Sequence, residues 1–135
     1  MNIELLNKVS LSADNTQKVR MMKGRTGLTP NILCRFGIIL SAREPGAAVP
    51  SEYDSDGMEF NRYTLYGAHE AMIVAIMKER CLEDGLDPEI AMPEQMRAHI
   101  NRGVVILYPR LRSVIDIVSL LDRPRTEQTV GALTR

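Results

Sequence analysis

The stretch GRTGLTPNILCRFGIILSAR, residues 24–43, determines how the first third of the chain folds. Thr29 followed by Pro30 is typical of a helix start, because the threonine hydroxyl caps the helix and proline is tolerated at its first position. Leu28 and Leu33 lie on either side of this start, at the spacing of a hydrophobic staple. The stretch therefore predicts a tight turn that leads into a helix.

This second helix is apolar around almost its whole circumference. One apolar stripe is predicted to face the core, and Ile38 and Ile39 widen it; the stripe consists of Ile32, Leu33, Phe36, Gly37 and Leu40. A helix that is apolar on every side must be covered. We expect the cover to come either from the rest of the chain or from a second copy.

The residues before the turn predict a short strand and a first helix. KVSLSAD (8–14) alternates apolar and polar residues, which indicates a half-buried strand. Ser12 or Asp14 is expected to cap the helix that follows, and Gly24 and Gly27 to end it. Strand, helix, turn and helix is the layout of a ribbon–helix–helix unit, in which strands from two copies form a ribbon that fits the DNA major groove.

The charged residues are segregated although the formal net charge is zero. Residues 1–43 carry a net charge of +5, residues 44–96 carry −9, and residues 97–135 carry +4. A basic segment beside an acidic one predicts a polyanion-binding surface. The alternative is that these charged side chains form solvated faces that pair with one another.

The predicted fold is mainly α, with a ribbon–helix–helix-like N-terminal unit followed by a bundle of about three helices. Residues 1–121 are expected to form a single helical DNA-binding domain, and residues 122–135 a flexible tail. The domain divides into a strand–helix–helix unit (1–43), an acidic loop (44–58) and a helical part (59–121). Within that last part we predict a strand at 59–66 and helices at 67–85, 93–109 and 110–121, with Pro93 at a helix start.

The chain carries no pattern that predicts catalysis, a cofactor or a metal site. It has no nucleotide-binding glycine motif and no CxxC, and its two histidines, His69 and His99, lie on different predicted helices. Cys34 and Cys81 are expected to be buried, reduced thiols. No apolar run is long enough to span a membrane, and the start resembles no secretory signal, so we expect a cytoplasmic protein without a membrane partner.

Four stretches together resemble the DndE family of DNA sulfur-modification (phosphorothioation) proteins. They are GRTGLTPNILCR (24–35), YGAHEAMIVAIMKER (66–80), EDGLDP (83–88) and RAHINRGV (97–104). The resemblance implies a small helical protein that forms a homo-oligomer, a tetramer, and binds double-stranded DNA with a preference for nicked duplex. It also implies other Dnd proteins as partners, which replace a non-bridging phosphate oxygen by sulfur.

The candidate DNA-binding residues surround the first helix and the turn. The resemblance assigns the basic N-terminal region to DNA contact, and the start of the second helix offers amide groups to a phosphate. An aromatic content of 4% disfavours single-strand binding by base stacking. The candidates are Lys8, Lys18, Arg20, Lys23, Arg25, Thr29 and Arg35.

Two other functions stay open at this stage. A ribbon–helix–helix repressor or antitoxin would read bases with the strand residues Lys8, Ser10 and Ser12. A DNA nickase would need a nucleophile, for which Tyr63 and Tyr66 are candidates, together with a metal ion. Nicking has been proposed for some proteins of the DndE family, but no catalytic residue can be assigned to it here.

Overall fold

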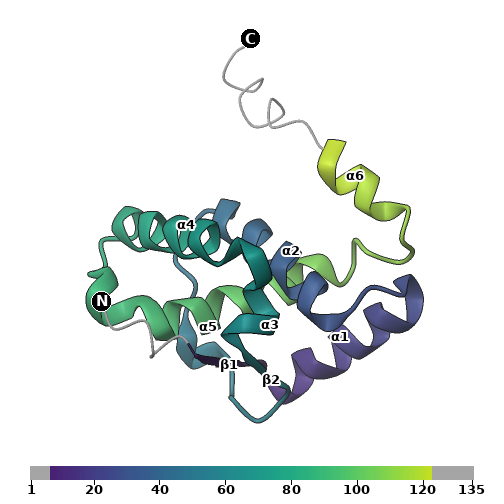
Figure 1. Cartoon of the computed structure of the whole chain (residues 1–135), viewed down its shortest axis with the longest axis horizontal. Helices are drawn as coiled ribbons and strands as arrows, with labels where there is room; N and C mark the ends of the chain where they lie inside the picture. The colour runs from purple at the N-terminus through teal and green to yellow at the C-terminus, as the bar shows by residue number, and fades with distance from the viewer. Residues whose placement is uncertain (1–6, 123–135) are drawn as a thin grey trace.

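Residues 7–122 are described by a computed structural model of the chain, which is mainly α-helical, as predicted (Figure 1). Residues 123–135 of the predicted tail lie outside the described residues. Two short 3-10 helices, η2 and η3, accompany the α-helices and strands. The elements follow in the order β1 (Lys8–Ser10), α1 (Ala13–Thr26), α2 (Pro30–Arg43), η2 (Pro50–Glu52), β2 (Glu59–Asn61), α3 (Arg62–Tyr66), η3 (Gly67–His69), α4 (Glu70–Glu83), α5 (Pro88–Leu107) and α6 (Asp116–Asp122).

The predicted turn between α1 and α2 is confirmed. Gly27 has φ +77°, and its N–H donates to the Lys23 carbonyl at 2.8 Å, which ends α1. Thr29 caps α2 by accepting from the Ile32 N–H at 3.4 Å, and Pro30 is the first helical residue. Ser12 is the cap of α1.

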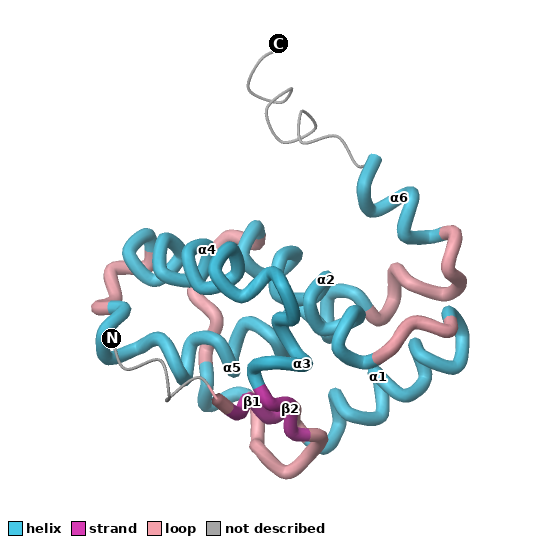
Figure 2. Tube along the Cα trace, in the orientation of Figure 1, coloured by secondary structure: helices cyan, strands magenta, loops and turns pink. Residues whose placement is uncertain are grey.

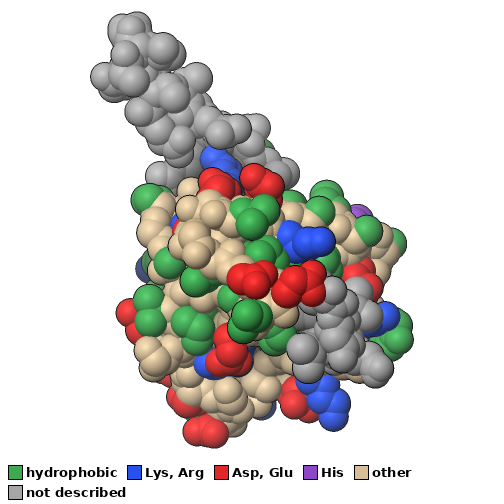
Figure 3. All heavy atoms as spheres, turned by 90° about the vertical axis from the view of Figure 1, so that its left-hand side faces the viewer, with side chains coloured by type: hydrophobic (Ala, Val, Ile, Leu, Met, Phe, Trp, Pro, Cys, Tyr) green, Lys and Arg blue, Asp and Glu red, His purple; other side chains and the backbone are tan. Residues whose placement is uncertain are grey.

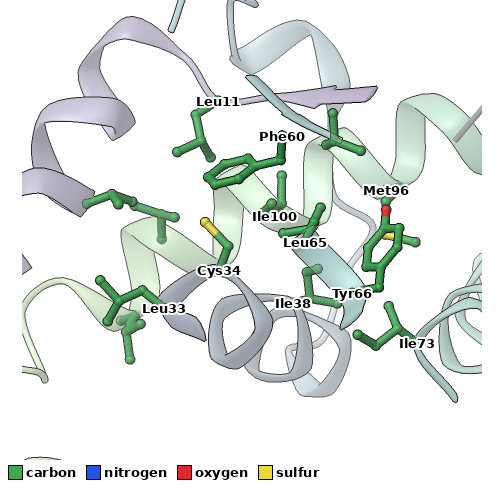
Figure 4. Close-up of a cluster of buried hydrophobic side chains, with 14 of the residues drawn as sticks. Leu11, Leu33, Cys34, Ile38, Phe60, Leu65, Tyr66, Ile73, Met96 and Ile100 are labelled. Atoms are coloured by element: carbon green, nitrogen blue, oxygen red, sulfur yellow. The ribbon is translucent and has the colours of Figure 1, made fainter. Parts of the chain in front are cut away.

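Helix α2 lies at the centre of the core, and it packs more extensively against α5 than against any other element. Its buried face overlaps the predicted stripe only in part, at Leu33 and Gly37, and Gly37 closely approaches Gly103 of α5. The core side carries Leu33, Cys34, Gly37, Ile38 and Ser41, whereas Ile32, Phe36 and Leu40 are only half-buried. Figure 4 shows Leu33, Cys34 and Ile38 pointing into the cluster that Ile100 and Leu65 complete.

The small sheet forms within one chain. Strand β1 pairs antiparallel with β2, and Val9 is opposite Phe60. A ribbon–helix–helix unit would pair β1 with its copy, so the two-stranded ribbon here is of a different kind. The strand predicted at 59–66 is too long, since the Asn61 side chain accepts from the Thr64 N–H at 3.0 Å and starts α3.

Helices α5 and α6 begin at different residues from those predicted. Helix α5 starts at Pro88 rather than Pro93, because the Asp87 side chain accepts from the Glu89 N–H at 3.0 Å and caps it. Pro93 lies inside the helix. The helix predicted at 110–121 begins only at Asp116, whose carboxylate accepts from backbone N–H groups of the preceding turn.

Three arginines hold the acidic loop 44–58, whose coil parts, drawn in pink in Figure 2, lie on either side of η2. Arg80 donates to the carbonyls of Ala42, Glu44 and Gly46 at 3.0, 2.7 and 2.5 Å. Arg97 donates to the Pro50 and Tyr53 carbonyls, and Arg102 to the Gly46 carbonyl. Arg80, Arg97 and Arg102 therefore have a structural role, because their guanidinium groups hold the backbone of this loop in place.

His99 is buried near Arg80 and Arg102, and this environment favours the neutral form of its imidazole. Its side chain is 1% exposed, and its Nδ1 lies 2.8 Å from the Ser41 hydroxyl. Burial lowers the pKa of His99 to about 4, helped by the nearby guanidinium groups of Arg102 and Arg80, while Asp84 acts in the opposite sense. The pKa in the unfolded chain is about 6.5.

We expect acid to destabilise the fold through His99. Between pH 6.5 and 4 the unfolded chain binds a proton that the folded chain does not, so the free energy of unfolding falls as the pH falls through this window. The slope from this group is at most about 1.4 kcal/mol per pH unit. Urea unfolding at pH 7, 6 and 5 measures it, and His99→Asn, which keeps a polar group near Ser41, should flatten the dependence. Parallel curves for the two proteins would contradict this assignment.

Candidate nucleic-acid interface

A buried asparagine fixes the start of α1 against α5. Asn101 has no exposed surface, and its Oδ1 accepts from the Ser12 N–H and from the Asn15 side chain, both at 2.9 Å. Its Nδ2 donates to the carbonyls of Ser10 and Arg97. The amide is thus fully hydrogen-bonded, which makes its burial favourable and sets the direction in which α1 projects.

Tyr108, at the end of α5, contacts two basic side chains of α1, Lys18 and Arg25. The Arg25 guanidinium lies 4.8 Å from the centre of its ring and donates to its hydroxyl at 3.3 Å. Lys18 lies 5.9 Å from the same ring and is also paired with Asp14. The spacing of Lys18 and Arg25, seven residues apart on one helix, indicates a shared face, but their aromatic partner could not be identified from the sequence.

The other candidates on α1 and at the turn point into solvent. Arg20 and Lys23 are exposed, and Thr29 is exposed at the start of α2. Lys8 lies on β1, where its side chain is 70% exposed and faces Glu59 at 3.9 Å. It therefore lies at the sheet, away from the group around Tyr108.

Arg35 is half-buried and is directed toward the end of α3. Its Nε donates to the Leu65 carbonyl at 2.5 Å and its guanidinium to the Thr64 carbonyl at 2.9 Å. These two bonds satisfy the end of the short helix α3. The structure thus separates Arg35 from the exposed basic residues of α1.

Two further arginines extend the basic group. Arg110 and Arg112 are exposed in the turn that follows Tyr108, and sequence reasoning did not select them. We call this part of the molecule the basic end; it comprises the end of α1, the start of α2 and the turn after α5, at the right of Figure 1. Its basic side chains are Lys18, Lys23, Arg25, Arg110 and Arg112.

The basic end has the physical properties of a phosphate-binding surface. Exposed Lys and Arg supply charge, and the positive end of the α2 dipole lies among them, beside Thr29. Tyr108 orders Arg25 in advance, which reduces the side-chain entropy that binding would cost. Such contacts recognise the DNA backbone and carry little sequence information.

The side chains that could act as nucleophiles differ in their exposure to solvent. Tyr63 is 71% exposed, whereas Tyr66 is fully buried, and burial raises its pKa. Burial also raises the pKa of the Cys34 thiol to about 12. Across residues 7–122, no three His, Cys, Asp or Glu side chains are grouped so that they could hold a metal ion.

The strand residues that a repressor would use are largely occupied. Ser12 is 5% exposed, and its hydroxyl accepts from the Asn15 N–H at 3.0 Å. Ser10 is half-buried, with its carbonyl bonded to Asn101. Of these three residues, Lys8 has an exposed side chain, which lies 3.9 Å from Glu59.

None of the helices in the described part of the chain is both long and apolar enough to cross a membrane.

Comparisons with known proteins give one consistent result. The family model for DndE, described as DNA sulphur modification protein DndE, matches residues 8–114. The crystal structure of DndE from Escherichia coli B7A, involved in DNA phosphorothioation modification, is similar with a TM-score of 0.62 and 24% identity. That match covers 75% of this chain and 95% of the other.

A second solved structure is similar over the same share of the chain. It is a glycine-to-lysine mutant of DndE involved in DNA phosphorothioation, with a TM-score of 0.59 and 21% identity, and the match covers 75% of this chain and 96% of the other. A search of curated proteins finds no match.

Proposed function

The chain belongs to the DndE family of DNA sulphur modification proteins, and on this basis we propose that it is the duplex-DNA-binding subunit of a phosphorothioation machinery. The observation that supports DNA binding is the basic end. There Lys23 and Arg25 of α1 lie next to the exposed N-terminus of α2, and Tyr108 holds Arg25 in place.

The proposed role is to hold DNA while other Dnd proteins carry out the chemistry, in the cytoplasm where the DNA lies. Lys18, Lys23, Arg25 and Thr29 contact the phosphates, and Lys8 and Arg20 extend the contact along the strand. Arg35 supports α3 instead of binding DNA. A nick makes the duplex easier to bend, so a tetramer with several basic ends binds nicked duplex in preference to intact duplex.

A salt titration tests the proposal directly. Fluorescence anisotropy of a labelled 20-base-pair duplex, intact or with one central nick, is measured from about 50 to 300 mM salt. With four or five phosphate contacts per protomer, we expect the logarithm of the binding constant to fall with a slope of roughly −4 against the logarithm of salt concentration. The nicked duplex should bind more tightly.

Competition with random-sequence DNA separates this function from that of a repressor. Random DNA should compete as well as any chosen sequence, because contacts to phosphate are independent of the bases. Binding that does not change with salt, or that resists random competitor, would argue against the proposal.

A further inference from the structure

Tyr63 carries the most exposed aromatic ring of the protein. All six Phe and Tyr residues of the chain lie within the described residues 7–122, and the other five are buried or half-buried. Tyr63, in contrast, is 71% exposed, at the second position of α3. A single exposed apolar residue needs no explanation by itself. The groups around Tyr63, however, suit one class of partner.

Arg62 holds the ring of Tyr63 in place. The Arg62 guanidinium carbon lies 4.9 Å from the centre of the ring, which is within the range of a cation–π contact. Arg62 is itself fixed, because its Nε lies 3.4 Å from the Glu70 carboxylate and its side chain is only 17% exposed. One face of the ring therefore lies against a guanidinium group and the other is open to solvent. A ring that is ordered in this way loses less entropy when it binds a flat partner.

Polar groups suited to DNA surround this ring. Lys8 on β1 lies opposite Asn61 on β2, two residues before Tyr63, and the Lys8 side chain is 70% exposed. Lys8 lies 3.9 Å from Glu59, but an ion pair between two exposed groups contributes little, so a phosphate can replace the Glu59 carboxylate. Asn61 and Thr64 are exposed as well. We call Lys8, Asn61, Tyr63 and Thr64 the sheet surface.

The sheet surface and the basic end lie near opposite ends of α1. The chain passes from β1 through Ser12 into α1, whose 14 residues lead to the basic end (Figure 1). At 1.5 Å per residue, α1 is about 20 Å long. This length corresponds to about six base pairs of B-DNA, in which successive nucleotides of a strand are about 3.4 Å apart. A duplex that runs along α1 from the basic end therefore reaches the sheet surface.

A nick offers an aromatic ring a base face that an intact duplex does not. In an intact duplex each base stacks on both of its neighbours, and a side chain that inserts between them must overcome the free energy of unstacking. A strand break removes one covalent link at that step, so the bases on its two sides separate more easily. An aromatic ring can stack on any of the four bases, since each has a π face.

We propose that Tyr63 stacks on a base at the nick and thereby gives the protein its preference for nicked duplex. Lys8 binds a phosphate beside the break, and the basic end binds the flanking duplex. This inference rests on the proposed function, and it assigns the preference for a nick to one side chain. Stacking requires the ring and not the hydroxyl group, which separates this role from that of a nucleophile.

Two substitutions in the full-length protein test this role by fluorescence anisotropy with the intact and the nicked 20-base-pair duplex. Tyr63→Ala removes the ring and should weaken binding to the nicked duplex by about 5- to 150-fold, the range that stacking of one base supplies. Its affinity for the intact duplex and its salt slope should not change, because the phosphate contacts remain. Tyr63→Phe keeps the ring and should bind both duplexes as the wild type does.

Ile90→Ala is the matched control, because it also removes an exposed apolar side chain. Ile90 is 80% exposed and lies near the start of α5. Figure 3 views the molecule from that side and shows Asp and Glu side chains among hydrophobic ones. Carboxylates repel DNA, so Ile90→Ala should bind both duplexes as the wild type does. Circular dichroism checks that the three variants are folded.

A second nicked duplex tests whether the ring acts on a base. It lacks the bases of the two nucleotides that flank the nick, so the ring has no base beside the break on which to stack. On this duplex Tyr63→Ala should bind as tightly as the wild type. An equal effect of Tyr63→Ala on both nicked duplexes would show that the ring does not act by stacking.

The outcomes separate this role from the proposed function. A Tyr63→Ala protein that keeps the preference for nicked duplex, or a Tyr63→Phe protein that loses it, would overturn the stacking role and leave DNA binding intact. A wild type that binds both duplexes equally would overturn the stacking role together with the preference for a nick. A wild type that binds neither duplex would refute the proposed function itself.

Discussion

Gly103→Ala is expected to destabilise the protein by about 3 kcal/mol or more, which is a large part of the ~5–15 kcal/mol that stabilises a typical domain. A Cβ atom at Gly103 would lie 2.0 Å from the Gly37 carbonyl oxygen and 2.2 Å from its carbonyl carbon. Both contacts are to backbone within α2, so no side chain can move aside. Relief requires α2 and α5 to separate, which would open the core between them.

Two other glycines provide matched comparisons for this prediction. Gly37→Ala should cost less, because its nearest contact would be 3.1 Å, to the Gly103 carbonyl carbon. Gly24→Ala should stabilise the protein by about 0.5–1 kcal/mol, since Gly24 lies within α1 with nothing within 4 Å of the added atom. Urea unfolding followed by circular dichroism ranks the three. A Gly103→Ala protein as stable as the wild type would show that the two helices do not cross as closely as described.

Reversing two charges at the basic end is expected to weaken DNA binding by about 10- to 100-fold at low salt. The variant is Lys23→Glu with Arg25→Glu, which removes two proposed phosphate contacts and introduces repulsion. Each lost contact should also reduce the salt slope by about 0.9, so the dependence on salt becomes shallower by nearly two. Anisotropy titrations at several salt concentrations give both quantities.

The matched control changes the same amount of charge elsewhere. Arg43 and Lys78 are exposed, and Arg43 is the last residue of α2, about 20 Å along the helix from Thr29. Arg43→Glu with Lys78→Glu brings the formal net charge to −4, as the test variant does. It should retain most of the affinity and the full salt slope. An equal loss in both variants would show that net charge alone drives binding and would remove the basic end as a defined site.

Local patterns were sufficient to predict the first helices. The Thr29–Pro30 start, the stop at Gly27 and the cap at Ser12 are all confirmed, because each depends on bonds between residues fewer than five positions apart. The helix predicted at 67–85 corresponds to α4 (Glu70–Glu83), which follows the 3-10 helix η3 (Gly67–His69). Where a stronger local signal was overlooked, the prediction was wrong, as with Asn61, which caps α3 within the predicted strand.

The sequence by itself determined that the chain is mainly helical, that its first third is basic and that its middle is acidic, since these follow from composition and from patterns among neighbouring residues. Only the tertiary structure decided which Lys and Arg side chains are available to bind another molecule and which are engaged within the chain. It directed Arg35 to the end of α3 and used Arg80, Arg97 and Arg102 to hold a loop. It brought Tyr108 to Arg25 from 83 residues away and paired β1 with β2 within one chain. The physical reason is that a side chain's partners are set by how helices pack, and the packing of α2 on α5 depends on a glycine contact between residues 66 positions apart.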